Sequence, residues 1–234
     1  MKAFHLLKCL DAPTPMLYDF LLLLRNPHLR TRTLRTWLGW TAATALGWAA
    51  AGLTGLPIGR VVLVEGGSAA ILNVAASMGL IGALIGALIG VGQWLYLRRR
   101  MRNAAAWLLA TAAGWGLGLP LALTVNLFLG LGISAGMYGM FVGGAVGMLQ
   151  GLAAREVVRR FPHWLVANLL AYVLGISAAG TFERTMLTAT GGTWGAAIWE
   201  PAISAGLAGL IAGLVTGITF TVFRLDTGRP DDLA

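Results

Sequence analysis

The sequence predicts an all-α membrane protein, a bundle of six transmembrane helices made of three parallel two-helix repeats around a pseudo-threefold axis. Three observations predict this fold. The 234-residue chain is 57% apolar and 11% charged, with a mean hydropathy of +0.76, which lies outside the range of soluble domains. It contains six apolar stretches of about 20 residues, each long enough to cross ~30 Å of hydrocarbon. A pattern of serine and glycine also recurs three times along the chain.

The six apolar stretches set the expected domain organisation. They are residues 37–56, 70–96, 104–123, 132–153, 164–182 and 202–223. We expect a cytoplasmic N-terminal segment over residues 1–35, a membrane domain over 36–224 and a cytoplasmic tail over 225–234. Within the membrane domain, the repeats occupy about 36–100, 101–160 and 161–224.

A stripe of small residues marks every second span. Ser77 is followed by four glycines, and the same spacing returns after Ser134 and after Ser204, 57 and then 70 residues further on. Steps of three and four residues place these glycines on one helix face, where missing side chains let another backbone approach closely. We therefore predict a helix-packing seam on each of these spans, here called a glycine stripe. The three stripes consist of Gly79, Gly82, Gly86 and Gly90, of Gly136, Gly139, Gly143 and Gly147, and of Gly206, Gly209, Gly213 and Gly217.

Each glycine helix is preceded by a helix with two aromatic residues eight positions apart. The pairs are Trp40 and Trp48, Trp107 and Trp115, and Trp164 and Tyr172. Each repeat therefore contains two crossings, and an even number of crossings inserts all three repeats in the same orientation. We expect the glycine helices to meet near the centre of the bundle and the tryptophan helices to lie outside, with tryptophans anchoring the membrane interfaces.

The formal charge of +8 indicates membrane topology rather than nucleic-acid binding, because the cations cluster beside the ends of spans. Of the 17 Lys and Arg residues, all but Arg60 and Arg184 fall on one side, and these two fall in the opposite loops. This bias predicts that both termini lie in the cytoplasm. Thr14 and Pro15 open a short apolar helix over residues 16–25, which we expect either on the cytoplasmic membrane surface or packed beneath the bundle.

Five polar residues form the candidate polar site of the sequence: Gln93, Gln150, Glu65, Glu183 and Glu200. Both glutamines follow the last glycine of a stripe by three residues, whereas the third repeat has Phe220 at that position. The two amides either bond helices together or line a polar path. Glu200 precedes Pro201 where the sixth span begins. Its carboxylate is either stabilised by the helix dipole or part of an external cation or proton site with another of the glutamates.

Reaction chemistry has no clear signature in the sequence. The string Gly132-Ile133-Ser134-Ala135-Gly136 matches a nucleophile elbow, but the tetrad Ile-Ser-Ala-Gly returns at 203–206 and all three histidines fall in cytoplasmic segments. The scattered histidines and the single Cys9 lack metal-ligand spacing, and the glycine-rich strings lack the lysine of a phosphate-binding loop. We therefore expect no enzyme activity, no metal and no cofactor.

The first junction between repeats contains a recognisable pattern. Gly90-Val91-Gly92-Gln93-Trp94-Leu95 is followed by arginines at 98–100, by Trp107 and by Gly114-Trp115. This segment resembles an uncharacterised group of bacterial multi-pass membrane proteins, in which a glycine-rich span ending in Gln-Trp-Leu, an arginine turn and a tryptophan-rich span recur. The second junction departs from the pattern, with Gly151 in place of Trp94. The resemblance implies a location in the bacterial inner membrane and implies no activity.

Together these patterns predict an integral membrane protein without a catalytic site. We expect a structural, accessory or assembly subunit that packs through its glycine stripes, with the lipid bilayer and another membrane protein or a second copy of itself as partners. The alternative is a small-solute transporter or channel along the pseudo-symmetry axis, with the glutamines at its inner end and the glutamates at its mouth. A filled axis favours the first hypothesis and a hollow axis the second.

Overall fold

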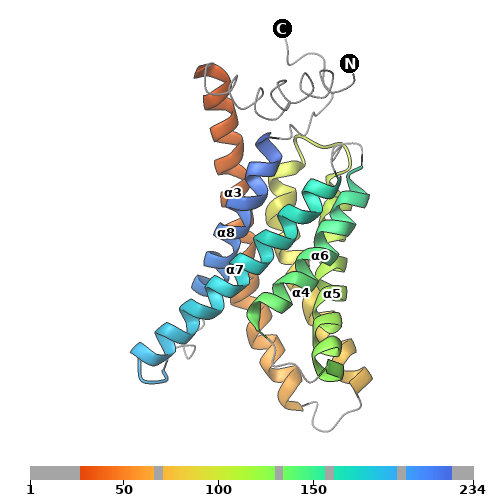
Figure 1. Ribbon diagram of the computed structural model, residues 1–234, viewed down its shortest axis with the longest axis vertical. Helices are drawn as coiled ribbons and strands as arrows, with labels where there is room; N and C mark the ends of the chain where they lie inside the picture. The colour runs from red at the N-terminus through yellow and green to blue at the C-terminus, as the bar shows by residue number, and fades with distance from the viewer. Residues whose placement is uncertain (1–26, 66–70, 130–133, 156–160, 194–198, 223–234) are drawn as a thin grey trace, which may run out of the picture.

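The computed structural model describes residues 27–65, 71–129, 134–155, 161–193 and 199–222, and within these ranges the chain is all-α. Six helices follow one another along the described chain (Figure 1). They are α3 (Pro27–Glu65), α4 (Ile71–Leu97), α5 (Ala104–Leu129), α6 (Ala135–Ala153), α7 (Phe161–Ala189) and α8 (Glu200–Val222). The predicted fold class is confirmed for this part of the chain.

Four of these helices are long and apolar enough to cross a membrane. The spans are Asn73–Leu97, Ala104–Val125, Phe161–Ala189 and Glu200–Thr219. At 1.5 Å of rise per residue, each reaches or exceeds the length that a hydrocarbon core of ~30 Å requires. These helices indicate a membrane protein, and the further crossings by α3 and α6 stay a prediction.

The six helices close into a ring in chain order. Each packs against the helices before and after it in the chain, and α8 also packs against α3. The first and last described helices are therefore neighbours, and α3 and α8 run side by side in Figure 1. Among the described helices, no two that face each other across the ring have their backbones in contact. The middle of the ring is left for side chains.

Two helices extend further than the apolar stretches predict. α3 has 39 residues, so it contains the expected boundary at residues 35–36 and continues through Arg60 to Glu65, where a loop was expected. α7 likewise continues through Glu183 and Arg184 to Ala189. Hydropathy finds only the part of a helix that lies in lipid, so polar turns at either end escape it. The short helix expected over residues 16–25 lies outside the described residues.

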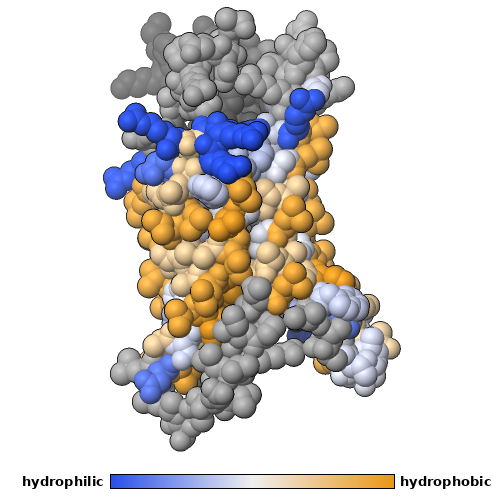
Figure 2. Space-filling model, turned by 180° about the vertical axis from the view of Figure 1, so that it is seen from behind, coloured by the Kyte–Doolittle hydropathy of each residue, from blue (hydrophilic) through white to orange (hydrophobic). Residues whose placement is uncertain are grey.

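Charged side chains gather at the two ends of the molecule. Figure 2 shows a band of hydrophilic residues at one end, with an apolar belt below it. Exposed arginines lie near the start of α3 and in the turns that follow α4 and α6, and they define the arginine end of the molecule: Arg35, Arg98, Arg99, Arg100, Arg102 and Arg155. The acidic residues within the described ranges are Glu65 at the end of α3, Glu183 near the end of α7 and Glu200 at the start of α8. These helix ends lie opposite the arginine end, because successive helices of the ring run in opposite directions.

Candidate functional site

The glycine stripe of α4 packs directly on the backbone of α5. A β-carbon built on Gly82 would lie 2.5 Å from the carbonyl oxygen of Trp115, and one on Gly86 would lie 2.6 Å from that of Thr111. Real β-carbons do not approach other atoms this closely, so only glycine fits at both positions. The outer members are less tight, with Gly79 and Gly90 at 3.2 and 3.1 Å from carbonyl oxygens of α5.

The stripes of α6 and α8 pack in the same way on α7 and α3. A β-carbon on Gly139 would lie 2.5 Å from the carbonyl oxygen of Tyr172, and one on Gly213 would lie 2.8 Å from the Cα of Thr41. The remaining glycines of the two stripes contact the same partner helices: Gly136, Gly143 and Gly147 contact α7, and Gly206, Gly209 and Gly217 contact α3. The stripe of α8 thus joins the end of the described chain to its beginning.

The expectation that the glycine stripes turn toward one common centre is wrong. Each stripe faces a single neighbouring helix and contacts its backbone and the inner atoms of its side chains. A face without side chains permits the closest contact between two backbones, and such contact brings helices together in pairs rather than around an open axis. The centre of the ring is filled instead by large side chains.

A second set of glycines was missed in the sequence. Gly47 of α3 and Gly114 of α5 would each place a β-carbon within 3 Å of the backbone of the following glycine helix, at Ile89 and Val146. Gly175 of α7 approaches Ala208 of α8 in the same manner, at 2.6 Å from its carbonyl oxygen. The sequence signal for this second set was that a glycine directly precedes both Trp48 and Trp115. As a result, helices approach closely on both sides of each aromatic helix.

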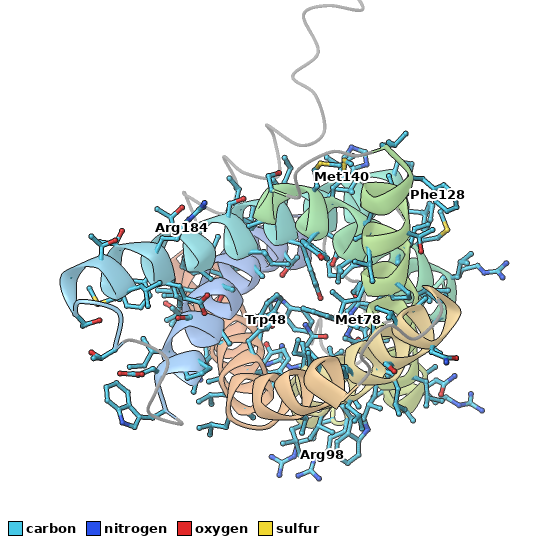
Figure 3. The ribbon with its side chains drawn as sticks, turned by 90° about the horizontal axis from the view of Figure 1, so that it is seen from below. Trp48, Met78, Arg98, Phe128, Met140 and Arg184 are labelled. Carbon is cyan, nitrogen blue, oxygen red and sulfur yellow. The ribbon has the colours of Figure 1, made fainter. Side chains whose placement is uncertain are left out.

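Six aromatic residues fill the axis in two layers. In the layer nearer the arginine end, the ring centroid of Trp107 lies 5.8 Å from that of Trp40 and 5.2 Å from that of Trp164. In the second layer, Trp48, Trp115 and Tyr172 form a triangle with centroid separations of 5.1, 5.4 and 5.9 Å. Figure 3, which views the ring of helices from below, shows Trp48 inside that ring.

These aromatic residues are part of the core. Trp40, Trp107 and Trp164 are at most 2% exposed, and Trp48, Trp115 and Tyr172 are also buried. The expectation that the tryptophan helices lie outside, with their rings at the membrane interface, is therefore wrong for these five tryptophans. The three aromatic side chains of each layer pack against one another between the helices, and edge-to-face contacts such as those of Trp107 add to the stabilisation.

The two glutamines meet between the aromatic layers. Gln150 donates from Nε2 to Gln93 Oε1 at 3.3 Å and to Thr111 Oγ1 at 2.9 Å. Gln93 Oε1 also accepts the indole N–H of Trp107 at 2.9 Å, and Gln93 Nε2 donates to Thr44 Oγ1 at 3.5 Å. The network therefore joins α3, α4, α5 and α6. Of the two roles that the sequence left open for these amides, the geometry fits the bonding of helices.

The third junction is built differently because the sequence has no glutamine there. The side chain of Phe220 lies outside the described residues. Trp40 donates its indole N–H to Thr216 Oγ1 of α8 at 2.9 Å, one turn before that position. Asn168 of α7 donates to the carbonyl oxygen of Trp164, one turn earlier in its own helix, at 3.0 Å. The junction between α8 and α3 is therefore joined through the hydroxyl of Thr216, whereas the other two junctions use Gln93 and Gln150.

The three glutamates do not join the glutamines. Glu183 is half-buried near the end of α7, Glu200 is buried as the first residue of α8, and the side chain of Glu65 lies outside the described residues. Gln93 and Gln150 lie in the last turns of α4 and α6, at the arginine end, whereas the glutamates belong to the opposite end. The five residues of the candidate polar site therefore form two separate groups.

Replacing Gln93 with leucine is expected to destabilise the protein more than replacing Gln150 with leucine. The first change removes the acceptor of the Trp107 indole N–H and one of the two acceptors of Gln150 Nε2, and a buried N–H that loses its acceptor costs about 1–3 kcal/mol. The second change removes two donated bonds and a carbonyl oxygen, Gln150 Oε1, that has no hydrogen-bond donor. We expect losses of about 3 and about 1 kcal/mol, measured by SDS unfolding titrations in mixed micelles. Equal losses would contradict the described bond directions.

The described residues contain no group of three His, Cys, Asp or Glu side chains that could hold a metal ion. The polar groups buried between the helices are mainly amides, hydroxyls and indoles, which interact through hydrogen bonds and ring contacts. The chain matches no protein-family model, no curated protein and no solved structure.

Proposed function

We propose that the protein is a non-catalytic, multi-pass component of the bacterial inner membrane, acting as a structural, accessory or assembly subunit. In this proposal it has six crossings in three repeats around a pseudo-threefold axis. The arginine end and both termini face the cytoplasm, following the positive-inside rule. The observation that supports the proposal most is that the axis is filled by side chains that bond to one another.

The glycine contacts support a threefold arrangement. The third glycines of the stripes, Gly86, Gly143 and Gly213, would each place a β-carbon 2.6–2.8 Å from backbone atoms of the next helix in the ring. The interfaces α4–α5, α6–α7 and α8–α3 are thus alike in chemistry and closeness. Repeats that each bury a face against the next one need one another for stability, and a closed ring leaves no stripe unused.

The filled axis supports a structural role over transport. A solute path along the ring would have to pass both aromatic layers, in which neighbouring ring centroids lie 5.1–5.9 Å apart. The amides that were candidates for lining such a path, Gln93 and Gln150, are buried and bonded to each other. Opening the axis would break these contacts and expose amide and indole groups.

The end opposite the arginines supports an assembly role. Figure 1 shows α7 leaning away from the other helices toward its C-terminal end. The side chains of its last three residues are exposed, including the apolar Leu187, and Trp199 just before α8 is also exposed. Apolar and aromatic side chains at a membrane boundary give contact area to a second membrane protein or to another copy of this chain.

Two measurements test the proposed function. Protein purified from its own membrane in mild detergent is expected to be a complex, either with another membrane protein or with itself, by mass photometry and mass spectrometry. A lone monomer whose stability is also independent of lipid would contradict the proposal. Proteoliposomes loaded with a panel of small ions and neutral solutes are expected to leak no faster than empty liposomes, and a saturable flux would support the transporter instead.

A further inference from the structure

Two arginines at the end of α4 each lie against an aromatic ring of that helix. The guanidinium carbon of Arg98 lies 5.4 Å from the centroid of the Trp94 ring, and that of Arg100 lies 4.3 Å from the Tyr96 ring. Both distances are within the range of cation–π attraction. Arg100 also donates from Nη1 to Thr36 Oγ1 at 3.4 Å, and Tyr96 OH donates to the carbonyl oxygen of Thr36 at 2.8 Å. Two arginines are thus oriented before any ligand arrives.

An apolar stripe on the outer face of α4 leads to these arginines. Leu80, Leu84, Val91 and Leu95 are exposed and recur at intervals of four and seven residues, so they share one face of the helix. Successive residues on a helix are 100° apart, so Trp94 and Tyr96 flank Leu95 on its two sides. Their partners Arg98 and Arg100 follow Leu97, the last residue of α4, and so lie just beyond the helix end at which the stripe stops.

We propose that this end of α4 binds an anionic glycerophospholipid. One acyl chain lies along the stripe at Leu84, Val91 and Leu95, and the phosphate is held between Arg98 and Arg100. Guanidinium groups suit phosphate because their N–H groups match two of its oxygens at once. Charge complementarity also favours an anion, because the described carboxylates all belong to the opposite end of the molecule. The proposal depends on the proposed crossing of the membrane by α4.

The corresponding turn after α6 lacks the same construction. The residues 57 positions after Trp94, Tyr96 and Arg100 are Gly151, Ala153 and Val157. Of Arg98 and Arg100, only Arg98 has a cationic counterpart, Arg155, whose Nε donates to the carbonyl oxygen of Leu152 in its own turn at 3.3 Å. The ring of Phe161 occupies the place where a side chain at position 151 would lie. The described part of the turn after α6 therefore lacks the aromatic supports of the lipid site, and Arg155 is a matched control for Arg98.

The proposal is tested by native mass spectrometry of the purified protein titrated with phosphatidylglycerol, and with phosphatidylethanolamine of the same acyl chains. We expect a saturable phosphatidylglycerol adduct that binds more tightly than the phosphatidylethanolamine adduct. One interfacial arginine contributes about fivefold to such binding, so Arg98→Gln is expected to weaken it about fivefold and Arg98→Gln with Arg100→Gln about 30-fold. Arg155→Gln, which removes the same charge from another turn, is expected to change it less than twofold.

A second variant separates a built site from general attraction of cations to anionic lipid. Trp94→Leu keeps every arginine but removes the ring beneath Arg98, and it is expected to weaken phosphatidylglycerol binding about two- to fivefold. Near-UV circular dichroism of the buried tryptophans checks that each variant is folded. Equal losses from Arg98→Gln and Arg155→Gln, no effect of Trp94→Leu, or equal affinity for the two lipids would overturn the proposal.

Competition identifies the source of the bound phosphate. Inorganic phosphate at millimolar concentration is expected to leave the lipid adduct in place, because it lacks the acyl chain that contacts the stripe. Displacement of the lipid by inorganic phosphate would instead assign the arginines to a soluble anion and overturn the lipid proposal. None of these results depends on whether the protein purifies as a complex, so failure here is distinguishable from failure of the proposed function.

Discussion

Replacing Trp107 with alanine is expected to lower the free energy of unfolding by about 4 kcal/mol or more, the cost of truncating a fully buried aromatic side chain. The Trp107 side chain is 0% exposed and contacts the rings of Trp40 and Trp164. Its indole N–H also donates to Gln93 Oε1, so the alanine variant leaves that amide with one donor fewer. The loss is measured by SDS unfolding titrations in mixed micelles, followed by circular dichroism at 222 nm.

Leu109 on the same helix provides the control for Trp107. Its side chain is 66% exposed on the outer face of α5. A leucine there would contact lipid tails in the folded and in the unfolded protein alike, so its removal changes little. Leu109→Ala is therefore expected to cost less than about 1 kcal/mol. A Trp107→Phe variant, which keeps an aromatic ring but removes the N–H, is expected to fall between the two. Equal stability of the Trp107→Ala and Leu109→Ala proteins would contradict a filled axis.

The second large effect is expected from Gly86→Ala. The added methyl group would lie 2.6 Å from the carbonyl oxygen of Thr111 and 2.7 Å from the Cβ of Trp115, so α4 and α5 would have to separate. Overpacking of this kind costs about 1–3 kcal/mol, and here the contact is with backbone that cannot rotate away. We expect a loss at the upper end of that range, measured by the same titration.

Gly206 gives the matched control within the glycine stripes. A β-carbon there would meet only the Cβ of Ala49, at an ordinary contact distance of 3.5 Å. Gly206→Ala is therefore expected to be neutral or to stabilise the protein by up to about 1 kcal/mol, because alanine is the better helix former. Similar losses for both glycines would show that the stripes act through backbone flexibility rather than through close approach.

The sequence was sufficient to predict the six described helices and the glycines that share one face of a helix, because both depend on local patterns. Steps of three and four residues identify a helix face, and six apolar stretches identify six helices. The partner of each face could not be predicted, since spacing along one helix does not say which other helix it meets. The stripe of α8, for example, contacts Thr41 of α3, more than 170 residues away.

The position of the tryptophans was predicted wrongly for a physical reason. Tryptophan is common at membrane interfaces because its ring is apolar and its N–H is polar. The same two properties suit a buried layer that contains hydrogen-bond acceptors, as Trp40 and Trp107 show by donating to Thr216 and Gln93. The eight-residue spacing placed both aromatics on one face but did not distinguish an inward face from an outward one.

The pairing of Gln93 and Gln150 was one of two alternatives left open by the sequence. Their equal distance from the last glycine of each stripe placed both at the same height in the bundle, which is necessary for contact. The contact itself depends on α5, which lies between α4 and α6 in the ring and contributes Thr111 to the same network. The glutamates were expected at the outer mouth of the alternative solute path, and the direction of the helices places their positions at the end opposite the glutamines.

The most direct test of the closed ring is a disulfide between α3 and α8. In a Cys9→Ser background, Ala49→Cys and Gly206→Cys place two β-carbons 3.5 Å apart, within the range that a disulfide requires. A control pair, Ala49→Cys with Gly144→Cys, joins helices that are not neighbours in the ring. After mild oxidation in native membranes, the first pair is expected to form a disulfide within one chain, so that the protein keeps the monomeric mass but has no free thiol. The control pair is expected to keep both free thiols. Failure of the first pair to cross-link, or cross-linking only between two chains, would contradict a ring that α8 closes onto α3.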